Sequence, residues 1–292
     1  MLLGIDPKVD YAFKHLLGRE STRPILIDVI DKVLNPGPGR HIREIELLNP
    51  FNAKEALDDK LSILDIKARD EMGRQFNVEM QMLAFPHYEQ RILYYWAKLH
   101  QQQLHEGEDY QNLKPTISIS FLNHVLFPQA PDHHLRFRLL EENRHFSLAD
   151  DIEFHILELP KFTKSLAELG SGLDIWLYFL CHAEKIDIEA LPAALEQPLV
   201  RRAFEELKMV TQTDLERERY ESRRKAQLDH NTIVNVARME GRNEGEKIGA
   251  IHMCERLLGR SETPTEQLAA LSLDELTRLA DELQEQLQKR PA

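Results

Sequence analysis

The stretch LDIKARDEMGRQFNVEMQ, residues 64–81, consists of two short apolar runs that are interrupted by charged and amide side chains. Side chains alternate between the two faces of a β-strand, so each run has one apolar face and one polar face. A charged turn that contains Gly73 separates the runs, as in an antiparallel hairpin. The stretch therefore predicts a β-hairpin whose apolar side, including Leu64 and Val78, packs in the core.

The polar face of this hairpin carries charged and amide side chains at positions where a half-buried strand would favour Val or Thr. Its members are Asp65, Lys67, Asn77, Glu79 and Gln81. A turn centred on residues 72 and 73 places Asp65 opposite Glu79, and in the same register Lys67 lies opposite Asn77. Cross-strand neighbours have Cβ atoms about 4.5 to 5.5 Å apart, so two carboxylates would face each other unless positive charge, such as a divalent cation, lies between them. A solvent-exposed polar face would show the same alternation.

The segments around the hairpin alternate between helix and strand patterns. Apolar spacing predicts two helices within residues 6–34, and the turn cluster NPGPGR at 35–40 ends the second. A long helix is expected over residues 88–107. Short runs rich in Ile and Leu predict strands within residues 41–51, 60–70, 75–83, 115–127, 134–143 and 152–162. Helical patterns dominate from residue 164 onwards, so a mixed α/β region precedes an α-helical one.

The C-terminal region changes composition to alternating charges between about residues 200 and 250. This pattern is typical of a solvated helix with ion pairs. Gly241, Gly245 and Gly249 recur every four residues and weaken a helix, so we favour a flexible or self-associating connector. After it, Ser272 is expected to cap an amphipathic helix that serves packing or assembly, including a homo-oligomer formed through the C-terminal helices.

Composition limits the function classes. The 292 residues carry a formal net charge of −12, which disfavours a surface that wraps nucleic acid nonspecifically but leaves room for a local basic groove. Cys181 and Cys254 have no Cys or His partner at ligand spacing, so neither a disulfide framework nor a structural zinc site is indicated. No apolar run approaches the roughly 20 residues that span a bilayer, so we expect a cytoplasmic protein without a membrane partner.

Three sequence blocks, in this order, resemble one known family. They are DYAFK at 10–14, LDIKARDEMGRQFNVEMQ at 64–81 and RILYYWAKLHQQQLHEGEDY at 91–110. Over about residues 5–160 they are similar to the Rpn family of recombination-promoting nucleases and transposase-like proteins, in the PD-(D/E)XK nuclease superfamily. The resemblance implies a restriction-endonuclease-like α/β fold with a mixed sheet flanked by helices. We expect this domain at 1–160, a helical elaboration at 161–230 and a helical C-terminal tail at 231–292.

The resemblance also implies roles for individual residues. Asp65 and Glu79 match the two acids that bind Mg²⁺ or Mn²⁺ and thereby activate water for hydrolysis of DNA phosphodiester bonds. Gln81 stands where the superfamily motif has lysine. Lysine helps to position or deprotonate water and stabilises phosphate charge, whereas a glutamine amide orients water but is neutral. This departure leaves open a catalytically weak, nuclease-derived DNA-binding or assembly protein; a purely structural α/β protein is a further alternative.

Four more residues are candidates for the same site. The resemblance suggests Asp10 as an additional metal ligand, although Asp10 and Lys14 also have the spacing of an ordinary helical ion pair. Arg91 and Lys98 share one helix side with Tyr95, which suits contact with a DNA backbone.

That helix also offers a competing core stripe, which consists of Ile92, Tyr95, Trp96 and Leu99. Lys67, on the polar hairpin face, either adds a cation to the site or is a solvated lysine.

Overall fold

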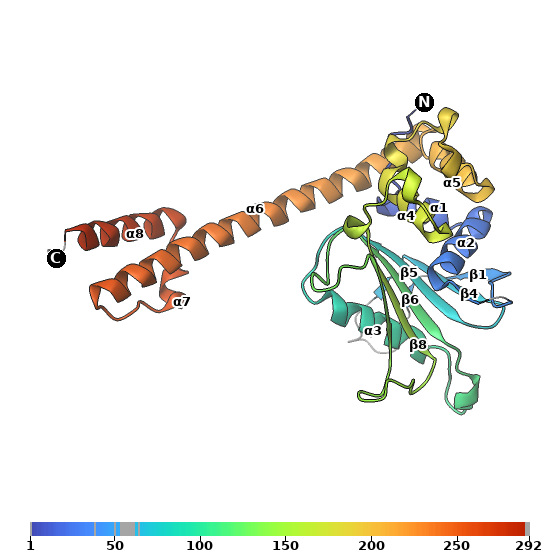
Figure 1. Ribbon diagram of the computed structural model, residues 1–292, viewed down its shortest axis with the longest axis horizontal. Coiled ribbons are helices and arrows are strands. Elements are labelled where there is room, and N and C mark those ends of the chain that lie inside the picture. Colours follow the sequence, from blue (N-terminus) through green and yellow to red (C-terminus); the bar gives the residue numbers. More distant parts are fainter. Residues whose placement is uncertain (1, 38, 50, 53–61, 64, 290–292) are drawn as a thin grey trace. The chain divides into compact units, whose positions relative to one another are not determined.

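The computed structural model describes residues 2–37, 39–49, 51–52, 62–63 and 65–289. The chain divides into two compact units, residues 1–224 and 225–292. The first unit is built on a six-stranded mixed sheet with strand order β1-β4-β5-β6-β8-β7 (Figure 1). Its strands are β1 (Ile45–Leu48), β4 (Ile66–Asp70), β5 (Gln75–Gln81), β6 (Thr116–Leu122), β7 (His134–Arg138) and β8 (Ile152–Glu158). A separate two-stranded sheet pairs β2 (Phe51–Asn52) with β3 (Ser62–Ile63).

Strand direction changes across the main sheet. The β1–β4 and β4–β5 pairs are antiparallel, the β5–β6 and β6–β8 pairs are parallel, and the edge strand β7 runs antiparallel to β8. The hairpin predicted from residues 64–81 is confirmed as β4 and β5, with Lys67 opposite Asn77. Leu64, which the alternation assigns to the core, lies outside the described residues.

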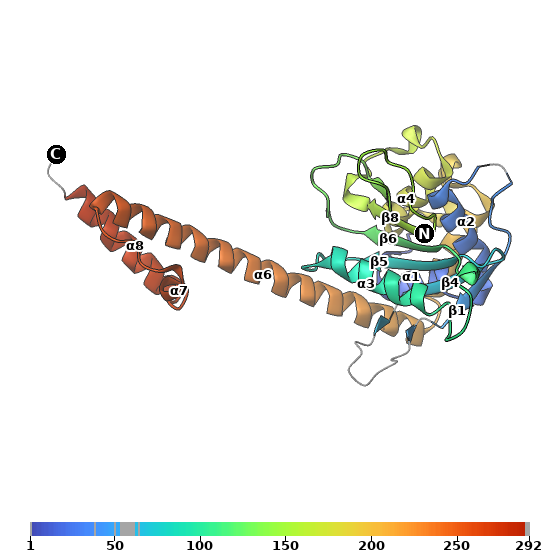
Figure 2. The same ribbon diagram turned by 90° about the horizontal axis from the view of Figure 1, so that it is seen from below.

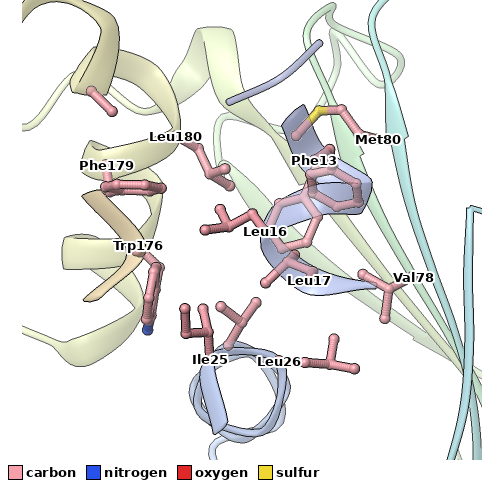
Figure 3. Packing of buried hydrophobic residues seen from close by; sticks show 14 of the residues in the cluster. Phe13, Leu16, Leu17, Ile25, Leu26, Val78, Met80, Trp176, Phe179 and Leu180 are labelled. Carbon is pink, nitrogen blue, oxygen red and sulfur yellow. The ribbon is translucent and has the colours of Figure 1, made fainter. Parts of the chain in front are cut away.

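Helices lie on both faces of this sheet (Figures 1 and 2). One face carries four helices, α1 (Asp10–Leu17), α2 (Arg23–Leu34), α4 (Gly172–His182) and α5 (Pro198–Met209). Their apolar side chains meet Val78 and Met80 of β5 in one core, where Phe13, Leu16 and Trp176 are buried (Figure 3). The opposite face of β5, which carries Glu79, lies against α3 (Tyr88–Gln101). A hairpin with one core face and one polar face thus becomes the centre of the fold.

The predicted restriction-endonuclease-like α/β architecture, a mixed sheet with flanking helices and a helical C-terminal region, is confirmed. The two N-terminal helices and the end of the second one also agree with prediction, since α2 stops at Leu34 and Asn35 adopts a left-handed backbone with φ of 46°. Helices α4 and α5 share the core with α1 and α2, so residues 161–224 complete the first unit.

The long helix expected over residues 88–107 is shorter than predicted, because α3 ends at Gln101. Leu99 is the last apolar residue that this helix buries. Beyond it, the Gln103 side chain donates to Thr116 Oγ1 at 2.8 Å and accepts from the Lys114 backbone N–H at 3.0 Å, which ties the chain to the start of β6. Gly107 belongs to the following turn, with φ of 88°.

The prediction of a flexible connector is wrong, because α6 (Asp214–Leu258) is one continuous helix through all three glycines. The alternative reading, a solvated helix with ion pairs, is what is observed: Gly245 and its neighbours are exposed, and Arg242 Nε lies 3.1 Å from Glu246 Oε1. Whether a second copy binds this helix stays a prediction.

The second unit closes through a small apolar core. The end of α6 packs with α7 (Thr265–Leu268) and α8 (Leu273–Gln288), and the core includes Ile251, Leu276 and Leu283. Ser272 caps α8 as predicted, in a capping box with Glu275. The apolar side of the predicted amphipathic helix is thus covered within the chain. Among the described residues, no helix has the length and apolar character needed to cross a membrane.

Gly245→Ala is expected to stabilise α6 by up to about 1 kcal/mol, since alanine loses less backbone entropy in a helix. An added Cβ at this position meets no atom within 4 Å. Amide hydrogen exchange around residue 245 measures the effect, and slower exchange is the expected result. Faster exchange combined with loss of a dimer in solution would instead mean that a second copy packs against the glycines.

Candidate metal and nucleic-acid site

Asp65 lies at the point where β4 begins, directly before Ile66, which pairs with Val78. Its Oδ2 accepts a hydrogen bond from the Met80 backbone N–H at 3.1 Å. The carboxylate thus satisfies a backbone N–H of β5 where the pairing with β4 ends. By the same register, Asp65 is the residue opposite Glu79. An apolar residue here could not supply this acceptor, which gives a local reason for an acid in an otherwise strand-forming stretch.

Glu79 is the buried acid of the site, with 4% of its surface exposed. Its Oε1 accepts from Asn77 Nδ2 at 3.0 Å, and its Oε2 lies 3.4 Å from the hydroxyl of Tyr88, which opens α3. Both donors are neutral. They fix the orientation of the carboxylate but do not balance its charge, which is costly to bury without a cation.

The pKa values of both acids are raised, and the charge of Asp65 contributes to the shift of Glu79. Burial, followed by the negative charge of Asp65, raises the pKa of Glu79 to about 7. Burial also raises the pKa of Asp65, and the charge of Lys14 works against this increase. A carboxylate pair whose pKa values are raised in this way has affinity for positive charge, which is a recognised mark of a functional site.

Lys14 forms an ion pair with Asp65. Its Nζ lies 3.1 Å from Asp65 Oδ1 and 2.6 Å from Asp10 Oδ1. The charges of Asp65 and Asp10 outweigh burial and raise the pKa of Lys14. The ordinary ion pair between Asp10 and Lys14 is therefore present, and through Lys14 it connects Asp10 to the predicted site.

The donor set is compatible with a hard divalent cation. In the part of the chain that the structure describes, no three His, Cys, Asp or Glu side chains are grouped so that they could hold one ion. Asp65 and Glu79 nevertheless supply the one or two carboxylates with which Mg²⁺ is usually held, the remaining ligands being waters and substrate phosphate oxygens. Asp10 as a further ligand stays a prediction.

Gln81 and Arg91 are in direct contact. Arg91 Nη2 donates to Gln81 Oε1 at 3.0 Å, and the Arg91 charge also opposes the increase in the pKa of Glu79. The sequence placed these two residues in one site by resemblance and by helix spacing, and the fold brings them together. Tyr95 lies beside Arg91, with 5.4 Å between the guanidinium carbon and the ring centroid.

The two candidate lysines are less exposed than a DNA-contacting lysine is expected to be. Lys67 Nζ donates to Gln102 Oε1 at 3.0 Å, and burial lowers the pKa of Lys67. The alternative of a fully solvated Lys67 therefore does not describe it. Lys98 lies two turns beyond Arg91 on α3 and is 8% exposed. Contact of either lysine with phosphate stays a prediction.

Sequence reasoning missed the polar residues that surround Glu79 from β6 and α3. In the parallel register, Ser118 lies beside Asn77 and Ser120 beside Glu79, and both serines are buried. The segment TISISFL did carry a signal, because a central parallel strand normally reads as a continuous apolar run. Tyr88 gave no such signal, since its role follows only from the packing of α3 against β5.

The comparisons with known proteins agree with this arrangement. No protein of curated function and no solved structure is significantly similar to the chain. The sequence model of one family, described as PD-(D/E)XK nuclease family transposase, matches residues 7–237. The match covers most of the 292 residues and contains every residue of the candidate site. On this evidence the chain belongs to the PD-(D/E)XK nuclease family transposases.

Proposed function

We propose that this protein is a DNA endonuclease that depends on Mg²⁺ or Mn²⁺, and that it acts in the cytoplasm in recombination or mobile-element activity, as its resemblance to the Rpn family suggests. The observation that carries the proposal is that the carboxylate of Glu79 is buried beside Asp65 and that its hydrogen-bond donors among the described residues, Asn77 and Tyr88, are neutral. A structural protein gains nothing from such a pair, because burying like charges together is destabilising. A divalent cation relieves that cost.

In this proposal each residue has a distinct task. Asp65 and Glu79 hold the metal, and Asn77 and Tyr88 fix the orientation of Glu79. A divalent cation held there would neutralise phosphate charge and lower the pKa of a water molecule. Gln81 uses its carbonyl oxygen to accept from Arg91, which leaves its amide N–H groups to orient water. Asp10 contributes through Lys14, which bridges it to Asp65.

DNA is the proposed partner, and it would bind through a local patch because the chain as a whole is acidic. Arg91, Lys67 and Lys98 are the proposed backbone contacts. Lys67 and Lys98 would need side-chain movement to reach a phosphate. Self-association through the C-terminal helices is a separate proposal, and it must use surfaces other than the apolar residues that α8 already buries against α6.

A second candidate function rests on the neutral side chain of Gln81. Without a lysine at this position the protein could bind DNA and cut it poorly or not at all, serving as a nuclease-derived binding or assembly protein. Both candidates predict DNA binding that weakens with salt. Only the first predicts cleavage.

The two candidates separate in one experiment. Supercoiled plasmid is incubated with the full-length protein in a titration of MgCl₂ and, separately, MnCl₂, with an EDTA control. Nicked or linear product that requires the divalent ion is the expected result. If plasmid is retarded on a gel but stays supercoiled at every ion concentration, the binding or assembly function replaces the endonuclease. The Glu46→Gln variant serves as a control, because it removes an exposed acid of β1 that pairs with Arg69 and is not one of the proposed metal ligands.

A further inference from the structure

Arg91 is held against the polar face of β5 by two kinds of contact. The first is the hydrogen bond from its Nη2 to Gln81 Oε1, 3.0 Å long. Gln81 lies two residues after Glu79 on the same strand face, so the two side chains emerge about 7 Å apart along the strand. The contact with Gln81 thus holds the guanidinium of Arg91, a residue of α3, close to the buried Glu79.

The second kind of contact is a set of three aromatic rings. The guanidinium carbon lies 5.6 Å from the ring centroid of Phe85, 5.3 Å from that of Tyr88 and 5.4 Å from that of Tyr95. Tyr88 and Tyr95 are seven residues apart on α3 and so lie on one side of the helix with Arg91. Rings that stack on a guanidinium restrict its orientation without using up its N–H donors in strong hydrogen bonds.

Arg91 consequently has N–H donors that are not used in the contact with Gln81. A guanidinium carries five N–H groups, and the contact with Gln81 uses one of them. The Nε atom is buried and has no hydrogen-bond partner among the residues that the structure describes. Over the same residues, no carboxylate forms an ion pair with Arg91, in contrast to Arg69 on β4, Arg74 in the turn before β5 and Arg136 on β7. An oriented guanidinium that has no carboxylate partner among the described residues and lies near the buried acid Glu79 fits an anion that arrives with a metal ion.

We propose that Arg91 binds the phosphate group of the DNA substrate at the reaction centre and that Gln81 positions it there. The neutral amide on the strand and the cation on the helix together do what a strand lysine could do alone. This inference rests on the proposed function and sharpens it: Gln81 becomes a positioning residue for a cation, and Arg91 becomes a specific contact to the phosphate that is attacked.

The first test measures binding without cleavage. The affinity of a short DNA duplex for the full-length protein is measured in Ca²⁺ over a series of KCl concentrations. Arg91→Met is expected to weaken binding about tenfold and to lower the slope of log Kd against log[KCl] by about 1, the signature of one lost phosphate contact. Arg91→Lys should keep the slope and lose part of the affinity, because lysine keeps the charge without the planar fork. The control Arg69→Met removes a paired, exposed cation from β4 and should leave the slope unchanged.

The second test moves the positive charge from position 91 on α3 to position 81 on β5. Arg91→Met is expected to slow metal-dependent cleavage 10- to 100-fold, and the double variant Gln81→Lys with Arg91→Met should recover most of that loss. Gln81→Met, which leaves Arg91 without its anchor, should also slow cleavage. Melting temperatures for every variant show whether the fold survives the loss of the ring contacts. If Arg91→Met itself unfolds, Arg91→Gln, which removes the charge but keeps a planar polar group beside the rings, is measured in its place and is expected to lower the slope by about 1.

The outcomes separate this inference from the proposed function. If Arg91→Met has the wild-type salt slope, or if the double variant is no faster than Arg91→Met, Arg91 does not bind the phosphate, even where the wild type cleaves DNA. If the wild type does not cleave but the slope changes as expected, phosphate binding by Arg91 stands and the endonuclease proposal fails.

Discussion

Asp65→Ala is expected to lower the rate of Mg²⁺-dependent DNA cleavage at least about 1000-fold. The variant removes one of two carboxylates proposed to hold the ion. It also leaves Lys14 with Asp10 as its remaining acidic partner at this point of the fold. Plasmid nicking measured at saturating Mg²⁺, together with a melting temperature, checks the prediction.

The loss must be distinguished from structural damage, because Asp65 also accepts the Met80 N–H bond. Asp65→Asn keeps an oxygen that can accept this bond and removes only the charge. We expect it to melt close to the wild type and to be nearly as slow as Asp65→Ala. Glu46→Ala, an exposed acid on β1, should retain full activity. Wild-type cleavage by a folded Asp65→Asn protein would exclude Asp65 from metal binding.

Much of the fold could be predicted from the sequence because it depends on local sequence patterns. Alternation in residues 64–81 determines which side of the hairpin meets α1, and the observed pair of Lys67 with Asn77 is the register that the turn position predicts. The errors have identifiable physical causes. The end of α3 depends on Gln103 bonding to Thr116, a contact between distant residues that helix periodicity does not encode. Helix α6 stays intact because isolated glycines reduce helix stability without preventing a long helix from propagating.

The candidate site was only partly accessible, for a related reason. Asp65 and Glu79 could be paired from one hairpin, whose register is set by a single short turn. The contact between Gln81 and Arg91 requires α3 to pack against β5, and Ser120 lies beside Glu79 only because β5 pairs in parallel with β6. Such pairings depend on long connections and packing. Sequence alternation could show that Ser120 is anomalous, but it could not show which residue Ser120 faces.

Glu79→Gln is expected to stabilise the metal-free protein at alkaline pH. The folded-state pKa of Glu79 is about 7, raised from an ordinary value of 4.5 by burial and by the charge of Asp65. A raised carboxylate pKa means that the folded state binds more protons than the unfolded state between these two values. The free energy of unfolding therefore falls as pH increases from about 4.5 to 7, by about 3 kcal/mol in total from this group. Below this window the protonated carboxyl carries no such cost.

Glutamine resembles the protonated form of Glu79 in shape and charge, so the stability difference between variant and wild type should vanish near pH 4.5 and reach about 3 kcal/mol at pH 8. Urea unfolding across this pH range in EDTA measures the difference. Adding Mg²⁺ at pH 8 should raise the melting temperature of the wild type, because a cation bound to the folded state relieves the repulsion.

The dependence of Mg²⁺ stabilisation on pH and on the Glu79 side chain tests whether Glu79 binds the ion. Mg²⁺ should stabilise the wild type much less at pH 5 than at pH 8, since protons then occupy the carboxylate that the ion needs. Glu79→Gln should show little Mg²⁺ stabilisation at either pH, whereas Glu46→Gln should behave as the wild type does. An equal Mg²⁺ effect in wild type and Glu79→Gln would place the ion elsewhere. If the free energies of unfolding of the two proteins in EDTA change with pH in the same way, ionising Glu79 does not destabilise the fold. The physical reason for a cation beside Asp65 would then be removed.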